Sequence, residues 1–286
     1  MRKALRWAGF GLGGLLLLLL VAALVLFALS EMVLRKRHDP VPEALPAPTA
    51  AQHANAARQA RILGCVSCHG EGLAGKVMFE APGVARVFAP NLTAIAARAS
   101  DQQLAAAIRQ GIGHDGRPLV VMPSPMYSRL TGQETAALVA WIRTLPKRPG
   151  GEDRSSFGPL GRFALAAGKF RTAPAMMEQF RSEVPIDLGP AHAAGRDLAS
   201  KTCSECHGPA LLGRKMDDGS EAPGLEVAAG YDLEQFKRLL RTGSTPSGKP
   251  LGLMKEVAVN DFSHLTDAEI GALHAYLDAR AKRLAR

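Results

Sequence analysis

A five-residue motif, Cys-x-x-Cys-His, occurs twice in this chain, at Cys65–His69 and again at Cys203–His207, and the two copies contain all four cysteines. This motif is the attachment signature of c-type haem: both thiols bond to the porphyrin, and the histidine that follows becomes an axial ligand of the iron. The sequence therefore predicts two covalently bound haem c groups. Their attachment points are Cys65, Cys68, Cys203 and Cys206, and their iron ligands include His69 and His207.

Three other uses of a Cys-x-x-Cys pair explain the pattern less well. Zinc sites usually join two such pairs about 15 to 20 residues apart, whereas Cys203 follows Cys65 by 138 positions. A redox dithiol does not need a histidine directly after it in both copies. A structural disulfide also leaves the two histidines unexplained.

Length, composition and charge agree with two haem-binding domains. The 286 residues suffice for about two domains of ordinary size. Aromatic residues make up only 5% of the chain, so covalent haem would provide much of the apolar bulk. Of the net charge of +9, the residues after position 37 carry only +4 (29 basic against 25 acidic), which haem propionates would largely cancel. We therefore expect no nucleic-acid partner.

An uncharged apolar stretch of 22 residues runs from Ala8 to Leu29. About 20 such residues cross a bilayer as a helix, whereas a cleaved signal peptide has an apolar part of about 7 to 15 residues before an Ala-x-Ala-like site. The nearest match to such a site is Ala28 to Ser30, so we favour an uncleaved transmembrane anchor over residues 1–37. Because c-type haem is attached outside the bacterial inner membrane, the rest of the chain is expected in the periplasm.

Residues 38–49 are predicted to form a Pro-rich tether. Four prolines lie between Asp39 and Pro48, so this stretch cannot continue a helix. A stiff, polyproline-like segment of this kind is expected to hold the first domain clear of the lipid surface.

The remaining sequence is one domain repeated twice. With an offset of 138, Gly75 aligns with Gly213, and with an offset of 132, Met122 aligns with Met254. The sequence of each copy predicts three short helices. The first leads into the haem motif, the second ends at a glycine, and the last begins with a Thr-x-x-Glu capping box. The first two are expected at 54–63 and 101–110, and in the second copy at 191–201 and 232–241; the last ones begin at Thr131 and Thr266.

The second axial position of each iron decides between electron transfer and catalysis. Met122 and Met254 lie at matching places, 53 residues after His69 and 47 residues after His207, in Gly- and Pro-containing loops before the last helix. We predict that these two methionines are the distal ligands.

Other residues compete for that position in the first copy. Met126 has no counterpart in the repeat, and His114, which would give a bis-histidine haem, aligns with Pro246. Met78 and Met216 come only nine residues after the motif histidine, so they are expected to pack against the haem edge.

A hydrogen bond from the proximal histidine would fix its ring. The carbonyl groups of Pro90 and Pro223 are the predicted acceptors for the Nδ1 protons of His69 and His207.

With these residues in place, the chain resembles the class I cytochrome c family, and more closely the tandem, membrane-anchored dihaem cytochromes c of bacteria. The matching segments are CVSCHGEGLAG, APNLT, GIGHDGRPLVVMP and LTGQETAALVAWIRTLP in the first copy, and CSECHGPALLG, APGLE, RTGSTPSGKPLGLM and LTDAEIGALHAYL in the second. The resemblance implies proximal histidines at His69 and His207 and distal methionines at Met122 and Met254. The second copy departs from the usual Met-Pro pair, because Lys255 follows its methionine.

The predicted architecture is all-α: an N-terminal transmembrane helix followed by two cytochrome c domains, at residues 50–149 and 190–286. The stretch 150–189 between them has no copy in the repeat and includes FGPLGRFALAAGKF, with cations between apolar residues. We expect a linker packed along both domains; a second membrane contact is the alternative.

The expected function is electron transfer rather than enzymatic catalysis. The favoured hypothesis is a carrier that relays electrons between a quinol-level complex or dehydrogenase and a periplasmic or membrane acceptor such as a terminal oxidase. A second hypothesis is a subunit that anchors a dehydrogenase or oxidase while it relays the electrons of that complex. A dihaem peroxidase is a third, but it needs one haem with an open or displaceable ligand.

Overall fold

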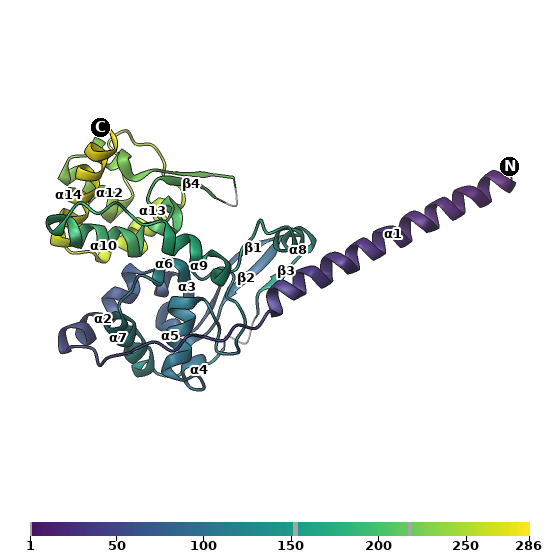
Figure 1. The fold of residues 1–286 in the computed structure, drawn as a ribbon, viewed down its shortest axis with the longest axis horizontal. Coiled ribbons are helices and arrows are strands. Elements are labelled where there is room, and N and C mark those ends of the chain that lie inside the picture. The colour runs from purple at the N-terminus through teal and green to yellow at the C-terminus, as the bar shows by residue number, and fades with distance from the viewer. Residues whose placement is uncertain (1, 151–153, 217–218) are drawn as a thin grey trace.

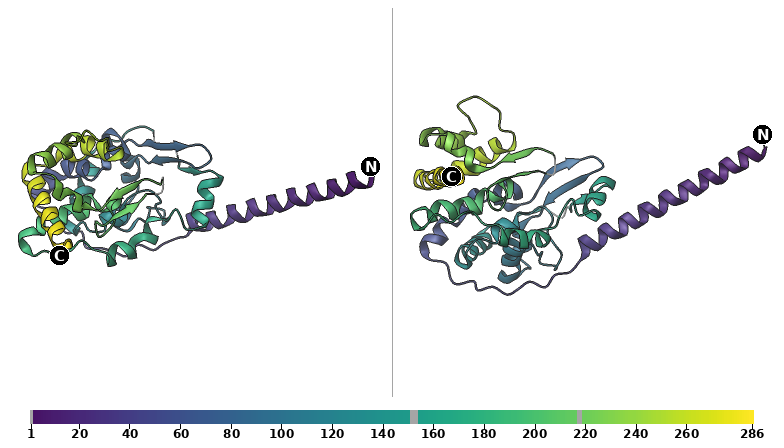
Figure 2. Two further views of the ribbon diagram at one scale, coloured as in Figure 1. Left: turned by 90° about the horizontal axis from the view of Figure 1, so that it is seen from above. Right: turned by 45° about the horizontal axis from the view of Figure 1, so that its top comes forward.

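The computed structural model describes residues 2–150, 154–216 and 219–286 (Figure 1). It is mostly helical, as predicted, and a long N-terminal helix projects from two packed domains (Figures 1 and 2). The first residue of the predicted anchor and residues 151–153 of the predicted linker lie outside the described residues.

The projecting helix is α1, Arg2–Arg35. Its segment Arg6–Arg35 has a mean hydropathy of 3.0 and is long and apolar enough to cross a membrane. By length and composition, α1 therefore suits the predicted anchor.

The first domain surrounds a buried core with short helices and a small sheet. Its helices are α2 (Ala50–Ile62), α3 (Cys65–His69), α4 (Leu92–Ala96), α5 (Asp101–Gln110), α6 (Ser124–Tyr127) and α7 (Gly132–Thr144), with the 3₁₀ turn η1 (Glu71–Leu73). Strands β1 (Lys76–Ala81) and β2 (Ala85–Ala89) form an antiparallel hairpin, and β3 (Ser156–Phe157) pairs with β2. This sheet was not predicted from the sequence.

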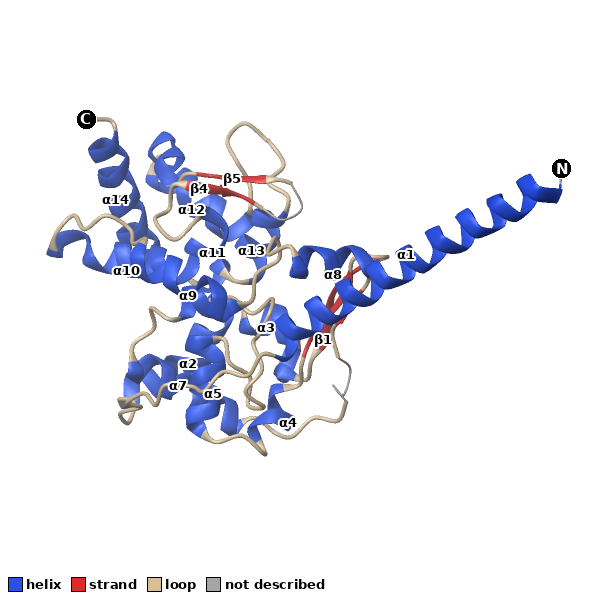
Figure 3. Cartoon of the chain, turned by 45° about the vertical axis from the view of Figure 1, so that its right-hand side comes forward, coloured by secondary structure: helices blue, strands red, loops and turns tan. Residues whose placement is uncertain are grey.

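The second domain repeats the plan with a shorter hairpin, whose two strands have three residues each. Figure 3 shows this hairpin beside the helices of the domain. Its helices are α10 (Ala193–Thr202), α11 (Ser204–His207), α12 (Leu233–Thr242), α13 (Leu253–Asn260) and α14 (Asp267–Leu284). Three 3₁₀ turns, η2 (Pro190–His192), η3 (Leu225–Gly230) and η4 (Phe262–His264), complete it, and strands β4 (Gly213–Lys215) and β5 (Glu221–Pro223) pair antiparallel.

Local signals predicted the helix ends well in both copies. Thr131 and Thr266 open α7 and α14 with the expected capping boxes. Gly111 and Gly243 end α5 and α12 in the left-handed conformation, with φ of 69° and 66°. The second half thus reproduces the backbone of the first at the positions that the repeat aligns.

The predicted linker contains two helices, α8 (Pro159–Ala166) and α9 (Ala173–Ser182). Phe180 of α9 belongs to the core of the first domain, and Leu188 packs against the core of the second. The Tyr276 hydroxyl donates a hydrogen bond to the Ile186 carbonyl at 3.0 Å. The segment packs along both domains, as expected.

The Pro-rich tether lies along the first domain. The Gln110 side chain accepts a hydrogen bond from the Val41 amide at 2.9 Å and donates one to the Val41 carbonyl at 2.7 Å. Glu43 pairs with Arg109, and the His38 amide donates to the Gly116 carbonyl at 2.9 Å. The tether is docked because α5 and the loop after it offer partners for its polar groups. Its expected role in holding the first domain clear of the lipid surface stays a prediction.

Candidate functional site

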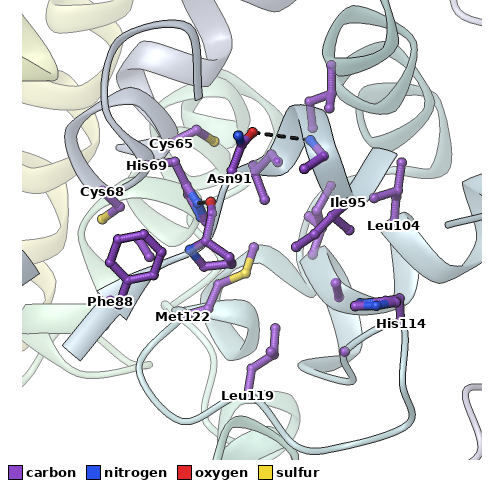
Figure 4. A pocket seen from close by; sticks show the side chains of 18 of the residues that line it. Cys65, Cys68, His69, Phe88, Asn91, Ile95, Leu104, His114, Leu119 and Met122 are labelled. Carbon is purple, nitrogen blue, oxygen red and sulfur yellow. Dashed lines mark hydrogen bonds between the residues drawn. The ribbon is translucent and has the colours of Figure 1, made fainter. Parts of the chain in front are cut away.

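A cavity of about 1000 Å³ opens in the first domain between α3, β2, α4, α5 and α7 (Figure 4). All four residues predicted to hold haem in this domain line it: Cys65, Cys68, His69 and Met122. Figure 4 shows the side chains of His69 and Met122 in the same cavity. Much of the remaining wall is apolar and comes from Leu104, Ile108, Leu138, Trp141 and Ile142. A cavity of this size and lining, with two thiols beside an imidazole, fits a covalently attached haem.

His69 is oriented by a hydrogen bond from its ring. Its Nδ1 lies 2.8 Å from the Pro90 carbonyl oxygen, which confirms the predicted partner. Because a carbonyl can only accept, Nδ1 carries the proton and Nε2 keeps the lone pair that an iron ligand needs. Burial lowers the pKa of His69, although the bond to Pro90 opposes this. The ring is therefore neutral at pH 7, as axial ligation requires.

Gly75 allows the backbone after the haem motif to pass close to the backbone at Asn91, which positions the neighbouring Pro90 carbonyl beside His69. Its φ is +88°, and a Cβ there would lie 2.8 Å from the Asn91 amide nitrogen. Asn91 in turn caps α4 by accepting from the Thr93 amide at 3.0 Å, and donates to the Arg148 carbonyl at 3.0 Å. The Pro90 carbonyl is therefore held between a glycine that admits no side chain and a buried asparagine.

The two cysteines of the first motif are half-buried and form no disulfide. Burial raises the pKa of Cys65 to about 12 and also raises that of Cys68. Thiols that hold their protons are poor redox nucleophiles and poor zinc ligands. Among the described residues, no group of three or more His, Cys, Asp or Glu could hold a metal ion. The raised pKa values of the two thiols disfavour the redox-dithiol hypothesis.

The second domain repeats this arrangement around His207. Its Nδ1 lies 2.7 Å from the Pro223 carbonyl oxygen, again the predicted partner. Gly213 has a φ of +86°, and a Cβ there would lie 2.6 Å from the Gly224 amide nitrogen. Burial raises the pKa of Cys203 to about 11. The local geometry that orients the first histidine therefore recurs at the second.

Met254 differs from the prediction in its local structure. The sequence placed it in a loop, but it lies in the first turn of α13, which begins after Gly252 with φ of +52°. It is half-buried and packs against the core of the second domain. Its assignment as distal ligand stays a prediction.

The two residues that compete with Met122 as distal ligand of the first domain lie in different parts of that domain. Met126 is buried on α6 within the core of the domain. His114 lines the cavity, and Figure 4 shows it on a part of the wall away from His69. Met78 also lines the cavity, in agreement with packing against the haem edge.

A set of cations in the wall of the cavity was not predicted from the sequence. They are Arg98, Arg117, Lys147, Arg148 and Arg154. Positive groups in a mostly apolar cavity suit the two propionates of a haem, which carry negative charge. The repeat contains one indication of these cations, because Arg117 aligns with another basic residue, Lys249, at the offset of 132.

The two haem-attachment motifs lie at the interface between the domains. Ser67, inside the first motif, donates a hydrogen bond to Asp261 of the second domain. On the other side, α6 contacts α11, which carries the second motif. Tyr127 of α6 donates to the Leu63 carbonyl, and burial, with smaller effects from Cys65, Cys68 and Glu205, raises its pKa. Tyr127 thus lies within electrostatic reach of both motifs.

Buried and half-buried ion pairs join the domains around this region. The Lys201 ammonium lies 2.9 Å from both carboxylate oxygens of Glu134, and only 7% of the lysine side chain is exposed. Arg58 forms a two-pronged pair with Glu269 at 2.7 and 2.9 Å. These contacts hold the two motifs in one mutual arrangement.

Comparison with known proteins agrees with this geometry. Residues 54–146 match the family "Cytochrome c", and residues 190–277 match the family "Cytochrome C oxidase, cbb3-type, subunit III". The fructose dehydrogenase cytochrome subunit of Gluconobacter japonicus is 27% identical, over 74% of this chain and 49% of that protein. The gluconate 2-dehydrogenase cytochrome c subunit of Pantoea cypripedii is 28% identical, over 76% of this chain and 57% of that protein.

The chain thus spans about half the length of the curated relatives it matches. Both relatives are cytochrome subunits of dehydrogenases, which supports the prediction of an electron carrier rather than an enzyme. Cytochrome c domains bind haem c covalently. With one such domain in each half, this protein is a tandem cytochrome c.

Proposed function

We propose that this protein is a membrane-anchored dihaem cytochrome that relays electrons from one haem to the other across the domain interface. The observation that carries the proposal is the position of the two attachment motifs, which lie at that interface next to Ser67, Asp261 and Tyr127. Haem iron supplies one-electron chemistry when bound. The protein would supply a fixed separation between the two sites, a mostly apolar environment and two ligands for each iron.

Each residue of the first site has a distinct task in this proposal. Cys65 and Cys68 would attach the haem covalently. His69, with its proton fixed on Nδ1, and Met122 would hold the iron, and with two protein ligands the iron would serve electron transfer rather than substrate binding. The apolar wall excludes water, and the cations of the cavity balance the propionates. In the second site Cys203, Cys206, His207 and Met254 take the same roles.

The relatives point to the kind of complex in which this relay operates. Both are cytochrome subunits of dehydrogenases, one for fructose and one for gluconate. We propose that this chain is likewise the electron-transfer subunit of a periplasmic dehydrogenase, tied to the bacterial inner membrane by α1. It passes electrons to a membrane or periplasmic acceptor of the respiratory chain, such as a terminal oxidase.

Purification of the tagged, full-length protein from native membranes in mild detergent tests this proposal. We expect a dehydrogenase subunit to co-purify and its substrate, a sugar or sugar acid, to reduce both haems. The Cys203→Ser/Cys206→Ser variant, which lacks the second covalent attachment, is the control and should show reduction of one haem only. A protein that purifies alone and reduces peroxide at a ligand-binding haem would contradict the proposal and favour the peroxidase.

A further inference from the structure

Helix α8 presents an apolar face that neither domain covers. Leu160 and Phe163 are 64% and 61% exposed, and Ala167 at the end of the helix continues the same stripe. These positions follow the spacing of one helical face. On the opposite face, Gly161 and Leu165 are buried. The helix therefore packs on the protein by one side and leaves an apolar side free.

This helix is docked at the base of α1 (Figures 1 and 3). The Arg162 guanidinium donates to Ser30 Oγ at 2.8 Å and to Glu31 at 2.9 Å, and it lies 4.1 Å from the centre of the Phe27 ring. Ser30 is fully buried by this contact region. A second attachment close by comes from Arg37, which donates to the Asp115 carbonyl at 3.0 Å. Helix α1 therefore meets the first domain in a defined orientation.

The contacts of Arg162 place α8 at a particular depth if α1 crosses a bilayer. The apolar stretch Ala8 to Leu29 has 22 residues, which is about 33 Å of helix and close to the hydrocarbon thickness of about 30 Å. Phe27 then lies at the edge of the hydrocarbon, and Glu31 lies among the headgroups. Because Arg162 contacts both, α8 is level with the boundary between acyl chains and headgroups.

The neighbouring groups suit the same environment. The Leu160 amide donates to the Gly83 carbonyl at 3.0 Å, so the tip of the β1–β2 hairpin lies beside the start of α8. Val84 at that tip is 39% exposed. Lys169 and Arg171 follow α8 and are exposed, where they can contact anionic headgroups.

We propose that the exposed face of α8 and the hairpin tip insert into the headgroup region of an anionic phospholipid bilayer, the one that α1 spans. This inference rests on the membrane anchoring in the proposed function. A single spanning helix leaves the domain free to rotate about it, whereas a second, interfacial contact fixes which side of the first domain faces the lipid. Since the cavity wall includes Phe157 and Arg154, just before α8, the first haem site is held on the membrane side of the molecule.

A cysteine-accessibility experiment on the full-length, haem-loaded protein tests the proposal. The four native cysteines are bonded to haem in the mature protein, so an introduced cysteine is the only free thiol. Phe163→Cys is compared with Leu284→Cys, a control at an exposed leucine (42%) near the C-terminus, distant from α1 in Figure 1. Both variants are placed in nanodiscs of phosphatidylethanolamine and phosphatidylglycerol, and the rate of reaction with a membrane-impermeant maleimide is measured.

We expect the thiol at position 163 to react at least tenfold more slowly than the thiol at position 284, with unchanged haem spectra. Equal rates in nanodisc-bound protein would overturn the inference while leaving the anchor intact. A disulfide-linked dimer through position 163 would also overturn it, because the face would then bind a second copy. If neither variant elutes with the nanodiscs, the membrane anchoring of the proposed function fails, and this inference fails with it.

Discussion

Ser67 of the first haem motif donates a hydrogen bond to the carboxylate of Asp261, which belongs to the second domain. This carboxylate is buried, and burial raises the pKa of Asp261 to about 6, even though the bond from Ser67 and the charge of Lys76 favour the ionised form. An ionisable group therefore lies in the contact that joins one haem-attachment loop to the other domain.

Replacement of Asp261 by asparagine should alter how stability depends on pH. The folded-state pKa of about 6 lies above the ordinary value of 3.8, so folding favours the protonated carboxyl. The stabilisation that this raised pKa of Asp261 gives to the folded state is present below about pH 4 and is lost as the pH rises through 6. Relative to wild type, the free energy of unfolding of Asp261→Asn should rise by about 2 kcal/mol between pH 4 and pH 7. Thermal unfolding at several pH values measures this, and a pH-independent difference would refute it.

The buried pair of Lys201 and Glu134 should contribute strongly to the domain interface. Lys201→Met leaves the half-buried carboxylate of Glu134 without its lysine partner. Such a loss costs about 3–5 kcal/mol for a fully buried carboxylate, and we expect a smaller cost here. Adding Glu134→Gln, which keeps the capping box of α7, should recover part of this loss. Denaturant unfolding provides the measurement. Arg61→Met is the control, because its pair with Glu71 is exposed and should matter little. Additive effects of the two changes would argue against a coupled pair.

The distal ligand of the first haem can be identified by a matched pair of substitutions. Met122→Leu keeps the volume but removes the sulfur, so one of the two haems should become high-spin and bind carbon monoxide. Met126→Leu makes the same change in the core and should leave the spectrum unaltered. Absorption spectra of the two variants, recorded with and without carbon monoxide, report the spin state of the haems and their binding of carbon monoxide. An unaltered spectrum in Met122→Leu would instead favour His114, which lines the same cavity.

Gly75 should tolerate alanine far less well than Gly83, although both have positive φ. At Gly83 the added Cβ meets nothing within 4 Å, so only backbone strain of about 1 kcal/mol is expected. At Gly75 the Cβ meets the Asn91 amide at 2.8 Å, so the cost should reach about 2–5 kcal/mol. Because Pro90 would also move, haem incorporation should fall. Equal haem content and stability in the two variants would show that Gly75 does not position Pro90.

The features that the sequence predicted are mostly local. The haem motifs, the capping boxes at Thr131 and Thr266 and the closing glycines each depend on residues within a few positions, and the repeat allowed one copy to check the other. The β1–β2 hairpin was missed although its turn contains Pro82 and Gly83, because β1 is exposed along almost its whole length and its residues do not alternate between apolar and polar.

Long-range partners explain the other misses. The tether docks because Gln110 lies where it can bond the Val41 backbone, 69 residues away in sequence. The contact of Ser67 with Asp261 joins residues 194 positions apart. Such pairs follow from tertiary packing, which neither periodicity nor motif spacing reports.

The most direct test of the central claim is a haem count combined with ligand spectroscopy on the full-length protein, expressed with c-type maturation machinery. A relay requires two covalent haems per chain, both low-spin, with the methionine-to-iron charge-transfer band and no spectral change on addition of cyanide or carbon monoxide. A single haem per chain, or a high-spin fraction that binds either ligand readily, would contradict the relay.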